Sequence, residues 1–310
     1  MRDLLVQPVE GTRPNKVFAD QTSSGDLSVE LYVASQGITY SDSEINGHFA
    51  ERGTFAEPPV VEKPWLAKET DDVVADCLDG SVVRMVGDLG SGKSTIFFGV
   101  RSRLREARMP YVYLDGHFTN NSNKMAAAIR RTTRLGGVVL FDSFDHLFMN
   151  DRNNARLGVH RPRESRSILL PALQEHVAAG GRLIFSNHTA PWFEHQSTPE
   201  HKAELDAFAA SVEAHEHRVH GMTRSPEELA ELCNRLGGQA YVQAYVERAL
   251  GSGHPTAMTY RVLKRALVST GVERMSAMGL DEFAAMVRDI DAQTRHKMGA
   301  PEEYPLVPSE

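Results

Sequence analysis

The chain has 310 residues, of which 41% are apolar, so it is long enough for one large or two ordinary globular domains. Its formal net charge of −7 argues against a uniformly basic nucleic-acid binder, although the segment from Arg101 to Arg166 holds 13 basic and 6 acidic residues. Cys77 and Cys233 form no paired motif, so neither a disulfide framework nor a cysteine zinc site is indicated. Since no long apolar run is present, the sequence predicts a cytoplasmic protein without a membrane partner.

The first 59 residues are predicted to form an N-terminal extension with some β content. The stretch LSVELYVASQGITYSDSE contains two short β-like runs around a Gln–Gly turn, and a Glu-Pro-Pro break follows at residues 57–59. Residues 60–224 then alternate apolar runs with helical patterns, which indicates an α/β core with a parallel sheet and helices on both faces.

The stretch MVGDLGSGKST, residues 85–95, contains a phosphate-binding pattern with Gly, four residues, then Gly-Lys-Ser. A β-branched run precedes it and apolar residues at helical spacing follow it, so the loop lies between a strand and a helix. We expect Lys93 to reach the β- and γ-phosphates and Ser94 to be a Mg²⁺ ligand. The predicted nucleotide-binding residues are Gly87, Asp88, Leu89, Gly90, Ser91, Gly92, Lys93, Ser94 and Thr95.

Further strands are predicted at residues 111–115, 138–142, 182–187 and 217–222. Asp142 ends the second of these, where ligands bind in parallel sheets, and is predicted to hold Mg²⁺ beside Ser94. Asp145 is placed to orient or deprotonate the attacking water, or alternatively to cap the next helix. Asn187, at the next strand tip, is the candidate for contact with the γ-phosphate or the water, and a plain turn residue is the alternative.

From Ser225 onward the pattern is helical, with a capping box at Ser225–Glu228, and it predicts a helical lid domain over residues 225–298. Residues 299–310 are predicted to be a flexible tail.

The order of these motifs resembles the AAA+ and STAND (NACHT-like) branches of the P-loop ATPases. Asp142-Ser-Phe-Asp145 is similar to the STAND form of the Walker B motif, and Gly253-His-Pro255 is similar to a lid motif that senses the base or phosphates. The resemblance implies a P-loop NTPase sheet with strand order 5-1-4-3-2 and a C-terminal helical lid, with Pro255 near the nucleotide. Ser143 stands where AAA+ proteins usually carry a catalytic glutamate, so slow hydrolysis is expected.

The resemblance also implies that an arginine reaches a neighbouring subunit's phosphates. Its usual segment is acidic here, so the candidates lie in the loop after Asp145: Arg152, Arg156, Arg161, Arg163 and Arg166. We therefore expect a homo-oligomer on ATP binding, with a partner protein or DNA providing the output.

The function predicted is that of an ATP-binding and ATP-hydrolysing switch or motor subunit. Two alternatives remain open: a small-molecule kinase, with Asp115 as the base toward an acceptor hydroxyl, and a nucleotide-binding scaffold without turnover.

Overall fold

The computed structural model describes residues 29–32, 64–87, 91–116, 122–149, 162–189, 197–221, 225–237, 239–270 and 272–298. Most of the predicted N-terminal extension and all of the predicted tail lie outside this range. Among the described residues, no helix combines the length and apolar character needed to cross a bilayer. Cys77 and Cys233 are both free and buried.

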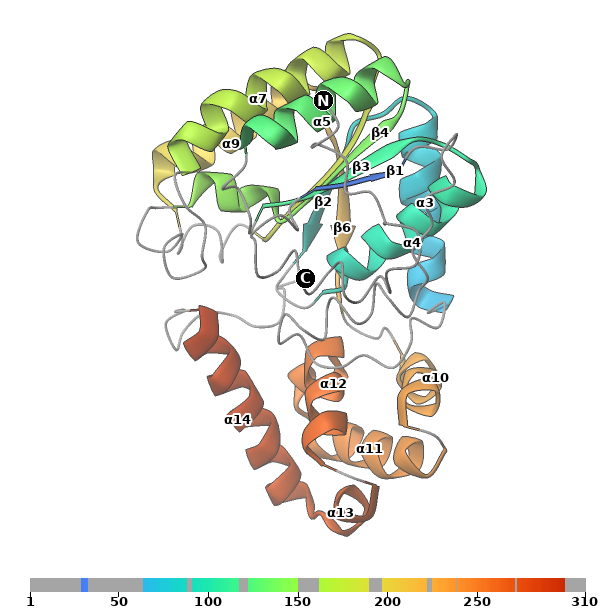
Figure 1. Cartoon of the computed structure of the whole chain (residues 1–310). Helices are drawn as coiled ribbons and strands as arrows, with labels where there is room; N and C mark the ends of the chain where they lie inside the picture. The colour runs from blue at the N-terminus through green and yellow to red at the C-terminus, as the bar shows by residue number, and fades with distance from the viewer. Residues whose placement is uncertain are drawn as a thin grey trace, which may run out of the picture.

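A six-stranded sheet forms the centre of the larger part of the molecule (Figure 1). Its strands lie in the order β1-β3-β4-β5-β2-β6, and all neighbours pair in parallel except β1, which is antiparallel to β3. Without β1, the five remaining strands have the predicted order 5-1-4-3-2. The strand bounds are β1 (Val29–Tyr32), β2 (Val83–Gly87), β3 (Tyr111–Asp115), β4 (Val138–Asp142), β5 (Arg182–Asn187) and β6 (His215–Val219).

Alternation along the buried strands sends side chains to two separate apolar layers. In β4, Val138 and Leu140 join one buried cluster, and Val139 and Phe141 join the other. The first layer packs against α3 (Pro64–Leu78) and α4 (Lys93–Glu106), and the second against α5 (Ser122–Arg134), α7 (Pro162–Ala178) and α9 (Pro199–Ser211) (Figure 1). Both faces of the sheet are therefore covered by helices, as predicted.

The strand predicted at residues 217–222 was placed too late, since β6 covers His215–Val219. It pairs only with β2 at the edge of the sheet, and four of its five side chains are partly or fully exposed. An edge strand needs no continuous apolar run, so hydrophobicity did not mark where it begins.

The C-terminal region is helical and lies beyond one end of the sheet, coloured orange to red in Figure 1. Its first helix begins with the predicted cap, because the Glu228 backbone N–H donates to Ser225 Oγ at 3.2 Å. Later in this region, Arg248 ties its helix to the segment near residue 277 by donating to the carbonyl oxygens of Met278 and Ser276. The elements are α10 (Pro226–Gly237), α11 (Gln239–Ser252), η5 (Pro255–Met258), α12 (Tyr260–Ser269), α13 (Val272–Ala277) and α14 (Leu280–Met298).

Candidate functional site

The predicted phosphate loop joins the end of β2 to the start of α4. Gly87 is the last residue of β2 and Lys93 is the first of α4, while Asp88, Leu89 and Gly90 lie outside the described residues. Gly92 has a φ of 105°, which glycine adopts without strain, and from there the helix begins. Lys93 Nζ donates to the Gly87 carbonyl oxygen at 2.6 Å, so the ammonium group folds back over the loop.

Two glycines allow the phosphate loop to lie close to the end of β6 and the residues that follow it. A Cβ at Gly87 would lie 2.5 Å from the Val219 carbonyl oxygen, and one at Gly221 would lie 2.3 Å from Ser91 Cα. Gly221 also has a φ of 66°, a second reason for glycine at that position. The sequence reading did not single out Gly221, because its importance depends on which strand lies next to β2.

Asp142 lies at the end of β4 and is held by three hydrogen bonds. Its Oδ1 accepts from the Ser143 backbone N–H at 2.8 Å and from Ser186 Oγ at 2.7 Å, and its Oδ2 accepts from Tyr113 Oη at 3.1 Å. A carboxylate offers about four lone-pair positions, so this 3% exposed group keeps room for about one more ligand. An oriented oxygen ligand of this kind, together with the Ser94 hydroxyl, suits Mg²⁺ held partly through water.

The strand order, the glycine-rich loop between the first core strand and its helix, and the aspartate that ends the third core strand decide the fold. This is the fold of a P-loop NTPase. The predicted Mg²⁺ ligand Asp142 is oriented by contacts that sequence alone did not give, since Tyr113 and Ser186 bond to it from the strands on either side of β4.

Asn187 does not lie against Asp142, although it belongs to the strand tip that the sequence singled out. Its Oδ1 accepts from Arg84 Nε at 2.8 Å and its Nδ2 donates to the His188 carbonyl oxygen at 2.7 Å. Because Phe141 pairs with Phe185, the residue beside Asp142 is Ser186, and the Asn187 side chain points to the opposite face. A one-residue difference along a strand therefore decides which side chain meets Asp142.

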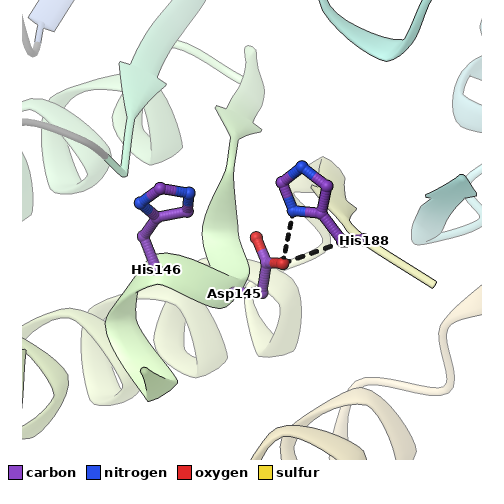
Figure 2. A group of neighbouring side chains, drawn as sticks. All are labelled: Asp145, His146 and His188. Atoms are coloured by element: carbon purple, nitrogen blue, oxygen red, sulfur yellow. Dashed lines mark hydrogen bonds and ion pairs between the residues drawn. The ribbon is translucent and has the colours of Figure 1, made fainter. Parts of the chain in front are cut away.

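Asp145 is completely buried on the short helix η4 (Phe144–Phe148) and pairs with His188 (Figure 2). Its Oδ2 accepts from the backbone N–H of His188 at 2.9 Å and forms an ion pair with His188 Nδ1 at 2.7 Å. Burial alone would raise the pKa of this carboxyl, but the charge and hydrogen bonds of His188 outweigh it and hold the pKa well below its usual range. A carboxylate stabilised in this way is a weak base, and η4 shows no side-chain capping bond, so neither predicted role of Asp145 is favoured.

Arg166, one of the candidate arginines, is buried within its own chain. It donates to the Leu147 carbonyl oxygen at 2.5 Å and lies 3.2 Å from Glu204 Oε2, so it is not placed to reach a neighbouring subunit. Arg163 is exposed at the start of α7, while Arg152, Arg156 and Arg161 lie outside the described residues. Pro255 begins η5 in the helical region.

No protein family and no curated protein matches the chain. Among solved structures it is similar to AMPPCP-bound DnaA from Aquifex aeolicus, with 10% identity, a TM-score of 0.36, and coverage of 77% of this chain and 92% of that one. It is also similar to Rhizobiales Trip13, with 11% identity, a TM-score of 0.39, and coverage of 81% and 97%. A third similarity is to a chain of the E. coli MS115-1 HORMA:CdnC:Trip13 complex, with 12% identity, a TM-score of 0.36, and coverage of 80% and 92%. Values this low assign neither an activity nor a partner.

Proposed function

We propose that the protein is a Mg²⁺-dependent ATPase of the AAA+ type that turns over slowly and works as a nucleotide-controlled switch. The observation that carries this proposal is the pairing of the phosphate loop, with Lys93 opening α4, and Asp142 fixed by three hydrogen bonds at the end of β4. A phosphate group meets the positive end of a helix and a lysine at such a loop.

In this account the chain mainly positions and neutralises the nucleotide. Lys93 and the backbone N–H groups at the start of α4 bind the β- and γ-phosphates. Ser94 and Asp142 hold Mg²⁺, which would neutralise charge on the same phosphates. Hydrolysis then requires a water molecule to attack the γ-phosphorus while the bond to the bridging oxygen breaks.

Slow turnover is the expected result, because neither Ser143 nor Asp145, the two residues that the Walker B resemblance places near the attacking water, is a good base. Ser143 stands at the position next to Asp142, and its backbone N–H is committed to Asp142 and Ser186. Asp145 is buried and paired with His188. The proposed role of Asp145 is to fix the tip of β5 rather than to remove a proton from water.

A contact path supports the switch role by joining the phosphate loop to the helical region. Gly221 packs directly on Ser91 of the loop, and its carbonyl oxygen accepts a hydrogen bond from the Tyr260 backbone N–H, the first residue of α12, at 3.2 Å. Ordering of the loop by phosphate would therefore reach α12 through Gly221. We propose that the helical region passes the nucleotide state to a partner protein or DNA, and that ATP favours self-association.

A small-molecule kinase fits the structure less well. Asp115, its candidate base, is 1% exposed, and α5 (Ser122–Arg134), between β3 and β4, packs against the sheet. This leaves the described residues after β3 without an acceptor-binding domain.

The experiment that tests the proposal follows γ-labelled ATP incubated with the full chain and Mg²⁺, with and without DNA. We expect the label to appear as inorganic phosphate, and Asp142→Asn to abolish this release. Transfer of label to an added acceptor would indicate a kinase, and tight ATP binding without any release would indicate a scaffold.

A further inference from the structure

Three buried side chains that can ligate metal meet beside the end of β4: Asp145, His146 and His188 (Figure 2). Asp145 and His146 are neighbours on η4, and His188 directly follows β5. The three are 0%, 2% and 5% exposed, and one potential ligand atom from each lies within 4.8 Å of the others. We call this group the Asp–His–His cluster.

We propose that the Asp–His–His cluster binds one divalent transition-metal ion of the zinc class. This site is separate from the Mg²⁺ position at Ser94 and Asp142, and its existence does not depend on the proposed ATPase activity.

The first argument is an unsatisfied buried oxygen. Asp145 Oδ2 is bonded to His188, but Oδ1 of this completely buried carboxylate has no hydrogen-bond partner among the described residues. Leaving a buried charged atom unbonded is costly. In Figure 2 the carboxylate lies between the two imidazole rings, and the oxygen without a dashed line faces the space between them. A cation in that space would satisfy it.

The second argument is the ligand set, two imidazoles and one carboxylate. Zinc sites with three protein ligands of this kind keep a fourth position for water or substrate, whereas Mg²⁺ and Ca²⁺ prefer oxygen ligands only. Ligand bonds of about 2.0–2.2 Å place tetrahedral ligand atoms roughly 3.3–3.5 Å apart. Asp145 Oδ1 would be the carboxylate ligand, His188 Nδ1 would bind the metal in place of the proton it shares with Asp145 Oδ2, now 2.7 Å away, and the His146 ring would move inward.

The third argument is the packing of η4, the helix that carries Asp145 and His146. Phe144 on η4 packs edge-on against Phe148 and Phe185, with ring centroids 5.4 and 5.0 Å apart, and all three rings are fully buried. This packing holds the backbone of η4 in place, so two of the three ligands extend from a fixed segment. Since η4 and the tip of β5 each supply ligands, a bound metal would also tie these two segments together.

The test uses the full chain, stripped with a chelator and kept free of nucleotide and Mg²⁺. After addition of equimolar Zn²⁺ and removal of free metal on a desalting column, we expect about one zinc ion per chain and a higher thermal unfolding midpoint. Co²⁺ in place of Zn²⁺ should give the visible absorption of a four- or five-coordinate ion. A folded wild-type chain that retains no zinc and gives no such absorption would overturn the proposal.

Variants locate the ion. His146→Gln and His188→Gln should each weaken zinc binding by more than about 100-fold, because loss of weaker outer-shell partners alone costs about 10–100-fold. The control is His215→Gln, whose side chain is 64% exposed on β6 near His217 and should leave binding unchanged. If His215→Gln lost the zinc and the cluster variants kept it, the ion would be bound by His215 and His217 on β6, and the proposal would be wrong.

Circular dichroism checks that each variant is folded. If the cluster variants unfold, the proposal is still tested by the Co²⁺ spectrum of the wild type and by whether His215→Gln keeps its zinc. Because the zinc assay contains no ATP, a negative result would overturn the zinc proposal without bearing on the ATPase proposal.

Discussion

Gly221 joins the phosphate loop to the helical region, and Gly221→Ala should damage ATP turnover far more than stability. Alanine at a φ of 66° costs about 1–2 kcal/mol of folding free energy. The new Cβ would also lie 2.3 Å from Ser91 Cα, where ordinary contacts begin near 3.4 Å, so the loop must move by about 1 Å. A misplacement of about 1 Å at a reacting centre costs on the order of 100-fold in rate. We therefore expect kcat/KM for ATP to fall by about 100-fold.

Gly136→Ala is the matched control, because Gly136 has a φ of 64° but nothing within 4 Å of an added Cβ. Gly136→Ala should show the loss of stability that the positive φ alone causes, and Gly221→Ala should lose at least as much in urea unfolding, but only Gly221→Ala should lose turnover, measured as phosphate release. Equal turnover in the two variants would refute the inferred coupling between Gly221 and the phosphate loop.

Three further predictions follow from buried groups and from the arginines. Ser186→Ala removes a hydrogen bond to Asp142 and should lower the affinity for Mg²⁺ by about 10–100-fold, measured by titrating Mg²⁺ in the phosphate-release assay. An unchanged Mg²⁺ titration would contradict the inference that Ser186 orients Asp142. Burial raises the pKa of both Cys77 and Cys233 to about 12, so neither thiol should react with a thiol reagent until the chain unfolds. The same raised pKa values make stability depend on pH, because thiols of the unfolded chain ionise near pH 8.5. The stability that the two neutral, buried thiols contribute is complete below about pH 8.5 and is lost as pH rises toward 12. Arg163→Ala should remove any rise of ATPase rate with protein concentration without weakening ATP binding, whereas Arg166→Met should instead lower stability by about 1–3 kcal/mol, as measured by urea unfolding.

The buried strands were predictable because each is a continuous apolar run that ends at a polar residue. β3, β4 and β5 have the predicted bounds, and each is almost entirely buried. β6 was shifted because its side chains are mostly exposed, and the antiparallel pairing of β1 with β3 depends on distant residues rather than on local pattern. Local sequence therefore identified the strands that are buried on both faces, and it predicted the edge strands β1 and β6 less accurately.

The site was predictable where a single segment supplies it and not where register brings segments together. Lys93 and Asp142 lie in recognisable local motifs. Tyr113 lies in the middle of an apolar run, and its contact with Asp142 follows from the β3–β4 register. That Ser186, rather than Asn187, bonds Asp142 depends on the β4–β5 register in the same way, while contact of Asn187 with the γ-phosphate or water stays a prediction. The strand order that the resemblance implied, combined with side-chain alternation, was the signal that could have found both.

The most direct test of the central claim is the affinity of the full chain for a non-hydrolysable ATP analogue with Mg²⁺, compared with that of Lys93→Met. Two charge-assisted bonds from Lys93 to phosphate oxygens, at about 1.5–3 kcal/mol each, correspond to roughly 10²–10⁴-fold in affinity. The account predicts a loss in this range for a folded Lys93→Met and no change for Lys68→Met, on the exposed surface of α3. Equal affinity of Lys93→Met and the wild type, or no nucleotide binding by the folded wild-type chain, would contradict it.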